Sequence, residues 1–299
     1  MPNKKTVGIY SASGCGGCSQ SVMFSTKLAA MLDASEIAFW ATESADLTTD
    51  DIAKLDDKGL DLLIYAGPVH GEDCIEKVKL LRGKSKRVVA YGACAHLGGL
   101  CGLANLVPGA QLRGLPATDG EEGFVQPLSA VIDVDYILPG CPPPEVMITR
   151  MVEDIFLSDE LPEPGTVFAE EKSVCAECSR THAPQPLTAI RRFHADPPDP
   201  EICLLDQGYI CLGPMTRGGC GAICLESNRA CTGCSGPIAG VQDQGGAILY
   251  ALASLVSFSG DDHEHKEQQV LDSIPDVVGT AYKYSAASSL LKRRVNDGE

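Results

Sequence analysis

The sequence contains no apolar run that approaches the ~20 residues needed to span a lipid bilayer. It is also poor in positive charge, because 24 Lys and Arg face 40 Asp and Glu, which gives a formal net charge of −16. Without a basic stripe to neutralise phosphates, we expect neither nucleic acid nor an anionic membrane surface as a partner. The first residues, MPNKKTVGIYSASG, carry no secretory or twin-arginine signal, so we expect a cytoplasmic protein.

Cysteine, by contrast, is abundant, with 14 in 299 residues. Cytoplasmic thiols stay reduced, so clustered cysteines indicate metal binding rather than a disulfide framework. Twelve of them fall into three sets of four, here called the first, second and third sets. These are Cys15, Cys18, Cys94 and Cys141; Cys175, Cys178, Cys203 and Cys211; and Cys220, Cys224, Cys231 and Cys234. One 4Fe–4S cluster requires four thiolates, so the sequence predicts three such clusters and electron transfer.

Strand and helix patterns alternate along the first half of the sequence. Apolar runs that predict strands lie at 7–11, 37–41, 61–66, 88–92 and 134–138. Helix patterns lie at 19–32, at 72–81 and after the three prolines at 142–144. The alternation predicts an α/β domain over residues 1–160, in which a flavodoxin-like parallel sheet has helices on both faces.

The first set of cysteines follows three of the predicted strands. Cys15 and Cys18 follow the first strand, and Cys94 and Cys141 each follow a later one. Open α/β sheets bind ligands at the carboxyl ends of their strands, so three separate loops bring these thiols toward one point. The loop SASGCGGCSQS has an alternative interpretation as a phosphate or flavin cradle, but it matches neither GxGxxG nor GxxxxGK(S/T). We therefore favour a cluster there.

The sequence changes character after a Pro/Gly-rich linker at 161–167. Cysteine and glycine are dense from 173 to 237 and periodicity is weak, so we expect residues 168–299 to form a smaller cluster-binding domain of mostly irregular and helical structure. Its C-terminal helix, predicted at 245–257, is expected to be buried.

Zinc is the alternative metal for this second half, because tetrahedral Cys₄ zinc also uses CxxC pairs. The two pairs here begin at Cys175 and Cys231, more than fifty residues apart, with Cys203, Cys211, Cys220 and Cys224 between them. This spacing favours two iron–sulfur sites over one zinc ribbon. A zinc-stabilised scaffold without redox function remains the competing hypothesis.

The motifs carry a family resemblance. In order they are SGCGGCSQS, YGACAHLGG, VIDVDYILPGCPPP, VCAECSR, ICLGPMTRGGCGAIC and ACTGCSGP. Together they resemble the small subunit of NiFe hydrogenases, and most closely the cytoplasmic methyl-viologen-reducing type of methanogens and some anaerobic bacteria. The resemblance extends over nearly the whole sequence.

The resemblance implies a role for each set of cysteines. The first set looks like the ligands of a proximal 4Fe–4S cluster, the third like those of a medial cluster and the second like those of a distal cluster. Cys224 supplies a fourth medial ligand that many periplasmic relatives lack. Cys175 stands where those relatives often have histidine, so His182 is not needed as a ligand. Cys74 and Cys101 occupy positions where no ligand is expected, and we interpret both as small buried side chains.

The resemblance also implies partners. The NiFe centre belongs to a separate large subunit, so no catalytic residue is expected in this chain. In the most similar relatives electrons leave the distal cluster for a small 2Fe–2S protein and then a flavin-based heterodisulfide reductase. A quinone- or formate-linked complex is the alternative destination.

Overall fold

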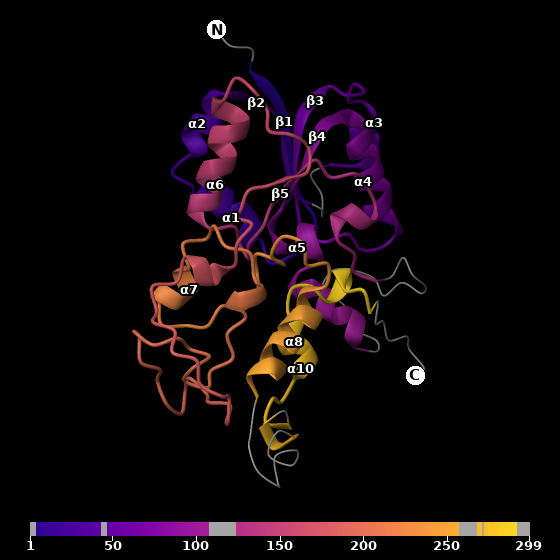
Figure 1. Cartoon of the computed structure of the whole chain (residues 1–299). Helices are drawn as coiled ribbons and strands as arrows, with labels where there is room; N and C mark the ends of the chain where they lie inside the picture. Colours follow the sequence, from indigo (N-terminus) through magenta and orange to yellow (C-terminus); the bar gives the residue numbers. More distant parts are fainter. Residues whose placement is uncertain (1–3, 43–46, 108–123, 257–267, 271, 292–299) are drawn as a thin grey trace. The chain divides into compact units, whose positions relative to one another are not determined.

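The computed structural model describes residues 4–42, 47–107, 124–256, 268–270 and 272–291 (Figure 1). The chain divides into two compact units. The first unit comprises residues 1–169, 234–236 and 284–299, and the second comprises 170–233 and 237–283. The domain limits expected from the sequence, 1–160 and 168–299, stay a prediction.

A six-stranded parallel sheet forms the first unit, in the order β2-β1-β3-β4-β5-β6. The strands are β1 (Lys5–Ser11), β2 (Ser35–Thr42), β3 (Leu60–Ala66), β4 (Ser85–Tyr91), β5 (Tyr136–Leu138) and β6 (Thr166–Val167). The order of the first five strands is that of flavodoxin, in which the chain reverses direction across the sheet between β1 and β3. The predicted α/β fold with a parallel sheet is confirmed.

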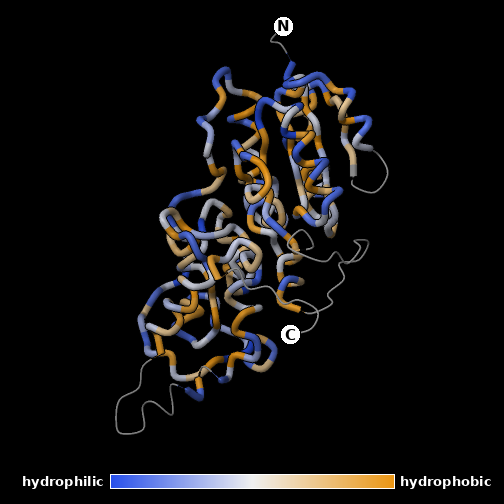
Figure 2. The backbone as a smooth tube through the Cα atoms, turned by 90° about the vertical axis from the view of Figure 1, so that its right-hand side faces the viewer, coloured by the Kyte–Doolittle hydropathy of each residue, from blue (hydrophilic) through white to orange (hydrophobic). Residues whose placement is uncertain are grey.

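Helices cover both faces of this sheet (Figure 1). On one side lie α2 (Leu28–Asp33) and α6 (Glu145–Val152), and on the other α3 (Thr49–Ala53) and α4 (Glu72–Lys84). Successive strand residues point to opposite faces, so Leu63 and Tyr65 of β3 join one core cluster with Val78 and Leu81 of α4. The intervening Ile64 is equally buried on the other face. Figure 2 accordingly shows hydrophobic residues along the strands.

Two local predictions for the first unit were wrong. The helix expected at 19–32 is two helices, α1 (Gly17–Met23) and α2, because Ser25 and Thr26 between them donate hydrogen bonds to the carboxylate of Glu145. The supposed linker at 161–167 ends in a strand, β6, which pairs with β5. Its two residues are β-branched, which favours an extended backbone.

The second unit has little regular structure, as predicted. Its helices are short: α7 (Ile223–Glu226), α8 (Gln244–Leu255) and α10 (Val277–Ala281). A small apolar cluster contains Val174, Leu204, Tyr209, Ala222 and Leu225 together with the side chains of Cys211 and Cys231. Cysteines thus form part of the core of this unit.

Helix α8 corresponds to the helix predicted at 245–257, but it is buried on one side only. Ile248 and Leu252 are buried, whereas the Tyr250 side chain is 77% exposed. Within the ranges described above, no helix combines the length and the apolar character required to cross a membrane.

Candidate metal centres

The first set of cysteines lies along the carboxyl edge of the sheet. Cys15 is in the loop after β1, and Cys18 is in α1, which follows that loop. Cys94 is in α5 (Gly92–Leu97), which begins where β4 ends, and Cys141 follows β5. Three loops that are far apart in the sequence therefore deliver thiols to one edge, where parallel sheets bind ligands.

These thiols are close enough to change one another's ionisation. Burial raises the pKa of Cys18 to about 12, with further contributions from Cys141 and Cys15. Burial also raises the pKa of Cys141 to about 11, and the neighbouring thiolates of Cys234 and Cys15 add to the shift. Each thiolate repels the next, so the group holds its protons until a positive ion compensates the charge.

Glycine backbone allows this close packing. Gly92 has a φ of +86° at the junction of β4 and α5, and a Cβ added there would lie 2.4 Å from the Cys18 sulfur. Gly99, with a φ of +61°, would place a Cβ 2.5 Å from the Cys94 sulfur. Only glycine combines this backbone conformation with direct approach of the main chain to a sulfur atom.

A fifth thiol lies beside the first set. The side chains of Cys101 and Cys94 share a hydrogen bond, which raises the pKa of Cys94 and lowers that of Cys101 to about 7. Cys101 is only partly buried, so its interpretation as a small buried side chain was wrong. The interpretation holds for Cys74, which is 5% exposed in the core, although its sulfur also lies 3.5 Å from the Tyr65 hydroxyl.

The second set of cysteines gathers within the second unit. Burial raises the pKa of Cys175 to about 11, with contributions from the thiolates of Cys211, Cys203 and Cys178. Burial likewise raises the pKa of Cys211, although the backbone N–H groups of Gly213 and Cys231 donate to its sulfur and oppose the shift. Such N–H···S bonds stabilise a thiolate, which is the form that binds a metal.

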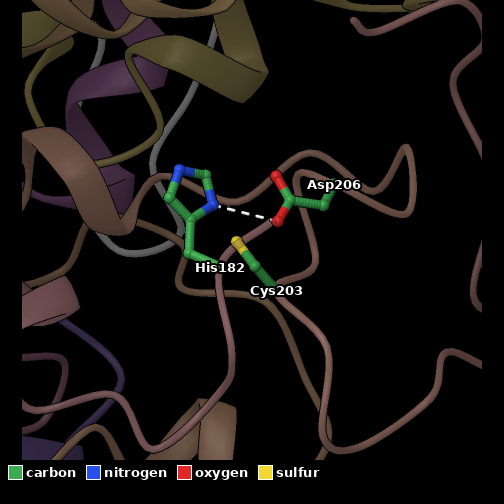
Figure 3. A group of neighbouring side chains, drawn as sticks. All are labelled: His182, Cys203 and Asp206. Atoms are coloured by element: carbon green, nitrogen blue, oxygen red, sulfur yellow. Dashed lines mark hydrogen bonds and ion pairs between the residues drawn. The ribbon is translucent and has the colours of Figure 1, made fainter. Parts of the chain in front are cut away.

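Side chains outside the cysteine sets fasten the loops of the second set together. Asp206 accepts hydrogen bonds from Ala183 N–H at 2.6 Å and from His182 Nδ1 at 2.9 Å. Figure 3 shows His182 and Asp206 beside Cys203, and their potential ligand atoms lie within 4.8 Å of one another. Cys203 N–H also donates to the Thr181 carbonyl. Nothing in the sequence singled out Asp206, because one more carboxylate in an acidic chain forms no motif.

The third set is divided between the two units. Cys220, Cys224 and Cys231 belong to the second unit, whereas Cys234 belongs to the short segment that packs with the first unit. Convergence of all four therefore stays a prediction. Glu177, which lies between Cys175 and Cys178, accepts hydrogen bonds from the backbone N–H groups of Gly219 and Gly221 on either side of Cys220.

The donor chemistry suits a sulfur-bound metal. All 14 cysteines lie in the described ranges, and none of them forms a disulfide there. Sets of four thiols without a neighbouring carboxylate are typical of iron–sulfur clusters and structural zinc. Together with a flavodoxin-type sheet, they define a class of iron–sulfur electron-transfer subunits.

Comparison with known proteins gives the family. Residues 15–155 match the model of the NADH ubiquinone oxidoreductase 20 Kd subunit family. The iron-sulfur subunit of the F420-non-reducing hydrogenase of Archaeoglobus profundus is 34% identical over 94% of this chain and 96% of its own length. The corresponding F420-non-reducing hydrogenase subunit of Methanothermobacter marburgensis is 31% identical over 99% and 98%. The chain belongs to the family of these hydrogenase subunits, which confirms the resemblance to NiFe hydrogenase small subunits.

Solved structures give a weaker similarity. The H2-activated [NiFeSe]-hydrogenase of Dm. baculatum matches 80% of this chain and 96% of its own, at 19% identity and a TM-score of 0.49. An NAD+-reducing [NiFe]-hydrogenase matches 55% of this chain and 97% of its own, at 24% identity and a TM-score of 0.41.

Replacing Gly92 by alanine should disrupt the first set. The added Cβ would displace the Cys18 sulfur, so we expect the iron content of the anaerobically purified protein to fall by one cluster, or about four atoms per chain. Gly165→Ala is a matched control, because Gly165 has a φ of +94° but no atom within 4 Å of the added Cβ. Equal iron content in the two variants would contradict the packing argument.

Acid should accelerate iron loss. The raised pKa values of Cys18, Cys141 and Cys175 mean that these thiols hold protons tightly, and protons compete with iron for the thiolates. We expect faster iron transfer to a chelator at about pH 6 than at about pH 8 under anaerobic conditions. A rate that does not change over this interval would argue against thiolate ligation.

The metal-free chain should respond in the opposite direction. A thiol whose pKa is raised by folding stabilises the fold below its ordinary pKa of 9.0, and this stabilisation is lost as the pH rises toward about 11 to 12. The thermal midpoint of chelator-treated protein should therefore fall over that alkaline interval.

Proposed function

We propose that this chain is the electron-transfer small subunit of a NiFe hydrogenase and holds three 4Fe–4S clusters. Electrons from H2 oxidation on a large-subunit partner pass through the proximal, medial and distal clusters to a downstream iron–sulfur and flavin acceptor, such as a heterodisulfide reductase complex. The protein works in the cytoplasm, where thiols remain reduced.

The observation that carries the proposal is the convergence of the first set. Cys18, Cys94 and Cys141 reach one edge of the sheet from separate loops and raise one another's pKa. Such an arrangement costs free energy in the absence of a metal, because buried thiols that cluster must either keep their protons or repel. Family membership supports the same function, since the Archaeoglobus profundus relative is described as a hydrogenase iron-sulfur subunit.

The residues of this chain bind the clusters and adjust their environment. When bound, each cluster accepts and returns one electron at a time. The first set holds the proximal cluster, the third the medial and the second the distal. The burial of Cys18 and Cys211 keeps water away from the sulfurs, and the N–H groups that donate to Cys211 stabilise negative charge on it.

Replacing Cys220 by alanine should interrupt the middle of the electron path. We expect H2-dependent dye reduction by the purified complex to fall at least about tenfold, because loss of a ligand costs no less than loss of an outer hydrogen bond. Hydrogen–deuterium exchange at nickel should be largely retained, since that reaction takes place on the partner subunit. Both activities are measured on the same anaerobic preparation.

Cys74→Ala is the matched control for this variant. Cys74 is a buried cysteine of the core and belongs to none of the three sets, so dye reduction and exchange should both persist. If Cys220→Ala loses exchange while the complex remains assembled, the assignment of Cys220 to the medial cluster is wrong.

A further inference from the structure

Arg180 is a buried cation in the second unit, 8% exposed and two residues after Cys178. Its guanidinium group makes four hydrogen bonds to oxygen atoms. Nη1 donates to the carbonyls of Asp199 and Ile202 at 2.8 and 2.9 Å, and Nη2 donates to the Leu225 carbonyl at 3.2 Å and to Asn228 Oδ1 at 2.6 Å. One side chain thus ties the loop before Cys203 to helix α7.

The positive charge has no counter-ion among these partners. All four acceptors are neutral, no ion pair joins Arg180 to a carboxylate in the described ranges, and its Nε–H is buried without a hydrogen-bond acceptor. Acidic side chains on the same segments are engaged elsewhere: Asp199 Oδ1 accepts from Glu201 N–H, and Glu226 accepts from the Ser179 hydroxyl. A buried unpaired charge is costly, so this position indicates an anion nearby.

The segments that Arg180 holds carry cluster cysteines. Ile202 immediately precedes Cys203 of the second set, and Leu225 immediately follows Cys224 of the third set. Consecutive Cα atoms are about 3.8 Å apart and hydrogen bonds are about 3 Å long, so the guanidinium lies within about 10 Å of both cysteines. The anion that fits the unpaired charge is therefore the negatively charged thiolate-bound cluster.

We propose that Arg180 acts as a fixed positive charge that raises the reduction potential of the distal cluster, and to a smaller extent that of the medial cluster. This inference rests on the proposed function. On reduction one electron arrives from the preceding cluster, ultimately from H2, and no bond forms or breaks. Because arginine stays protonated, no proton accompanies the electron, and the added negative charge is stabilised by the fixed cation.

Three variants separate charge from structure. Arg180→Met removes the charge and the donors, Arg180→Gln removes the charge and keeps an N–H donor, and Arg180→Lys keeps the charge in a different shape. Each variant of the anaerobically purified complex is titrated with redox mediators and followed by electron paramagnetic resonance, with iron quantified in parallel. Arg192→Met is the control, because Arg192 is an exposed arginine of the same unit.

The expected result is a selective shift of one cluster signal. In Arg180→Met and Arg180→Gln the equilibrium constant for reduction of the distal cluster should fall about tenfold, which is about 59 mV for one electron. Arg180→Lys and Arg192→Met should retain the wild-type potential. If Arg180→Met fails to assemble, the comparison of Arg180→Gln with Arg180→Lys decides.

The role of Arg180 is overturned if the neutral variants keep the wild-type potential, or if the lysine variant shifts as far as the neutral ones. Failure of the proposed function gives a different result. In that case the wild-type complex itself shows no reducible iron–sulfur signals.

Discussion

The structure depends on the bonding of a metal to groups of buried thiolates. Thiols that are buried together, such as Cys18 with Cys141, have raised pKa values because each negative charge repels the next. A cluster reverses this relation, since its iron ions supply positive charge where the protein cannot. The dependence is strongest in the second unit, whose small apolar cluster includes the side chains of Cys211 and Cys231. Metal binding there contributes to folding as well as to electron transfer.

The two units position their thiols in different ways. In the first unit a regular sheet determines where each loop begins, so Cys94 and Cys141 share an edge because β4 and β5 are neighbours. In the second unit irregular loops are held by side chains instead. Asp206, Glu177 and Arg180 each connect segments that carry different cysteines. A redox protein benefits from such fixed polar groups, because their charges and N–H donors also set the potentials of the clusters.

The sequence predicted the sheet well because buried parallel strands are continuous apolar runs, and 61–66 coincides with β3 to within one residue. It also placed the first cysteines after the correct strands. It missed the break between α1 and α2, since the hydrogen bonds from Ser25 and Thr26 to Glu145 span about 120 residues of sequence. Arg180 escaped notice for the same reason: its burial and its acceptors are consequences of tertiary structure, whereas CxxC spacing is local.

Metal analysis of the complex after anaerobic co-purification tests the central claim most directly. Iron, acid-labile sulfide, zinc and nickel are quantified in each separated polypeptide. Three 4Fe–4S clusters require about twelve iron and about twelve sulfide atoms in this chain, a brown colour that bleaches on reduction, and nickel confined to the large subunit. A colourless chain that contains two or three zinc atoms and no sulfide would contradict the account.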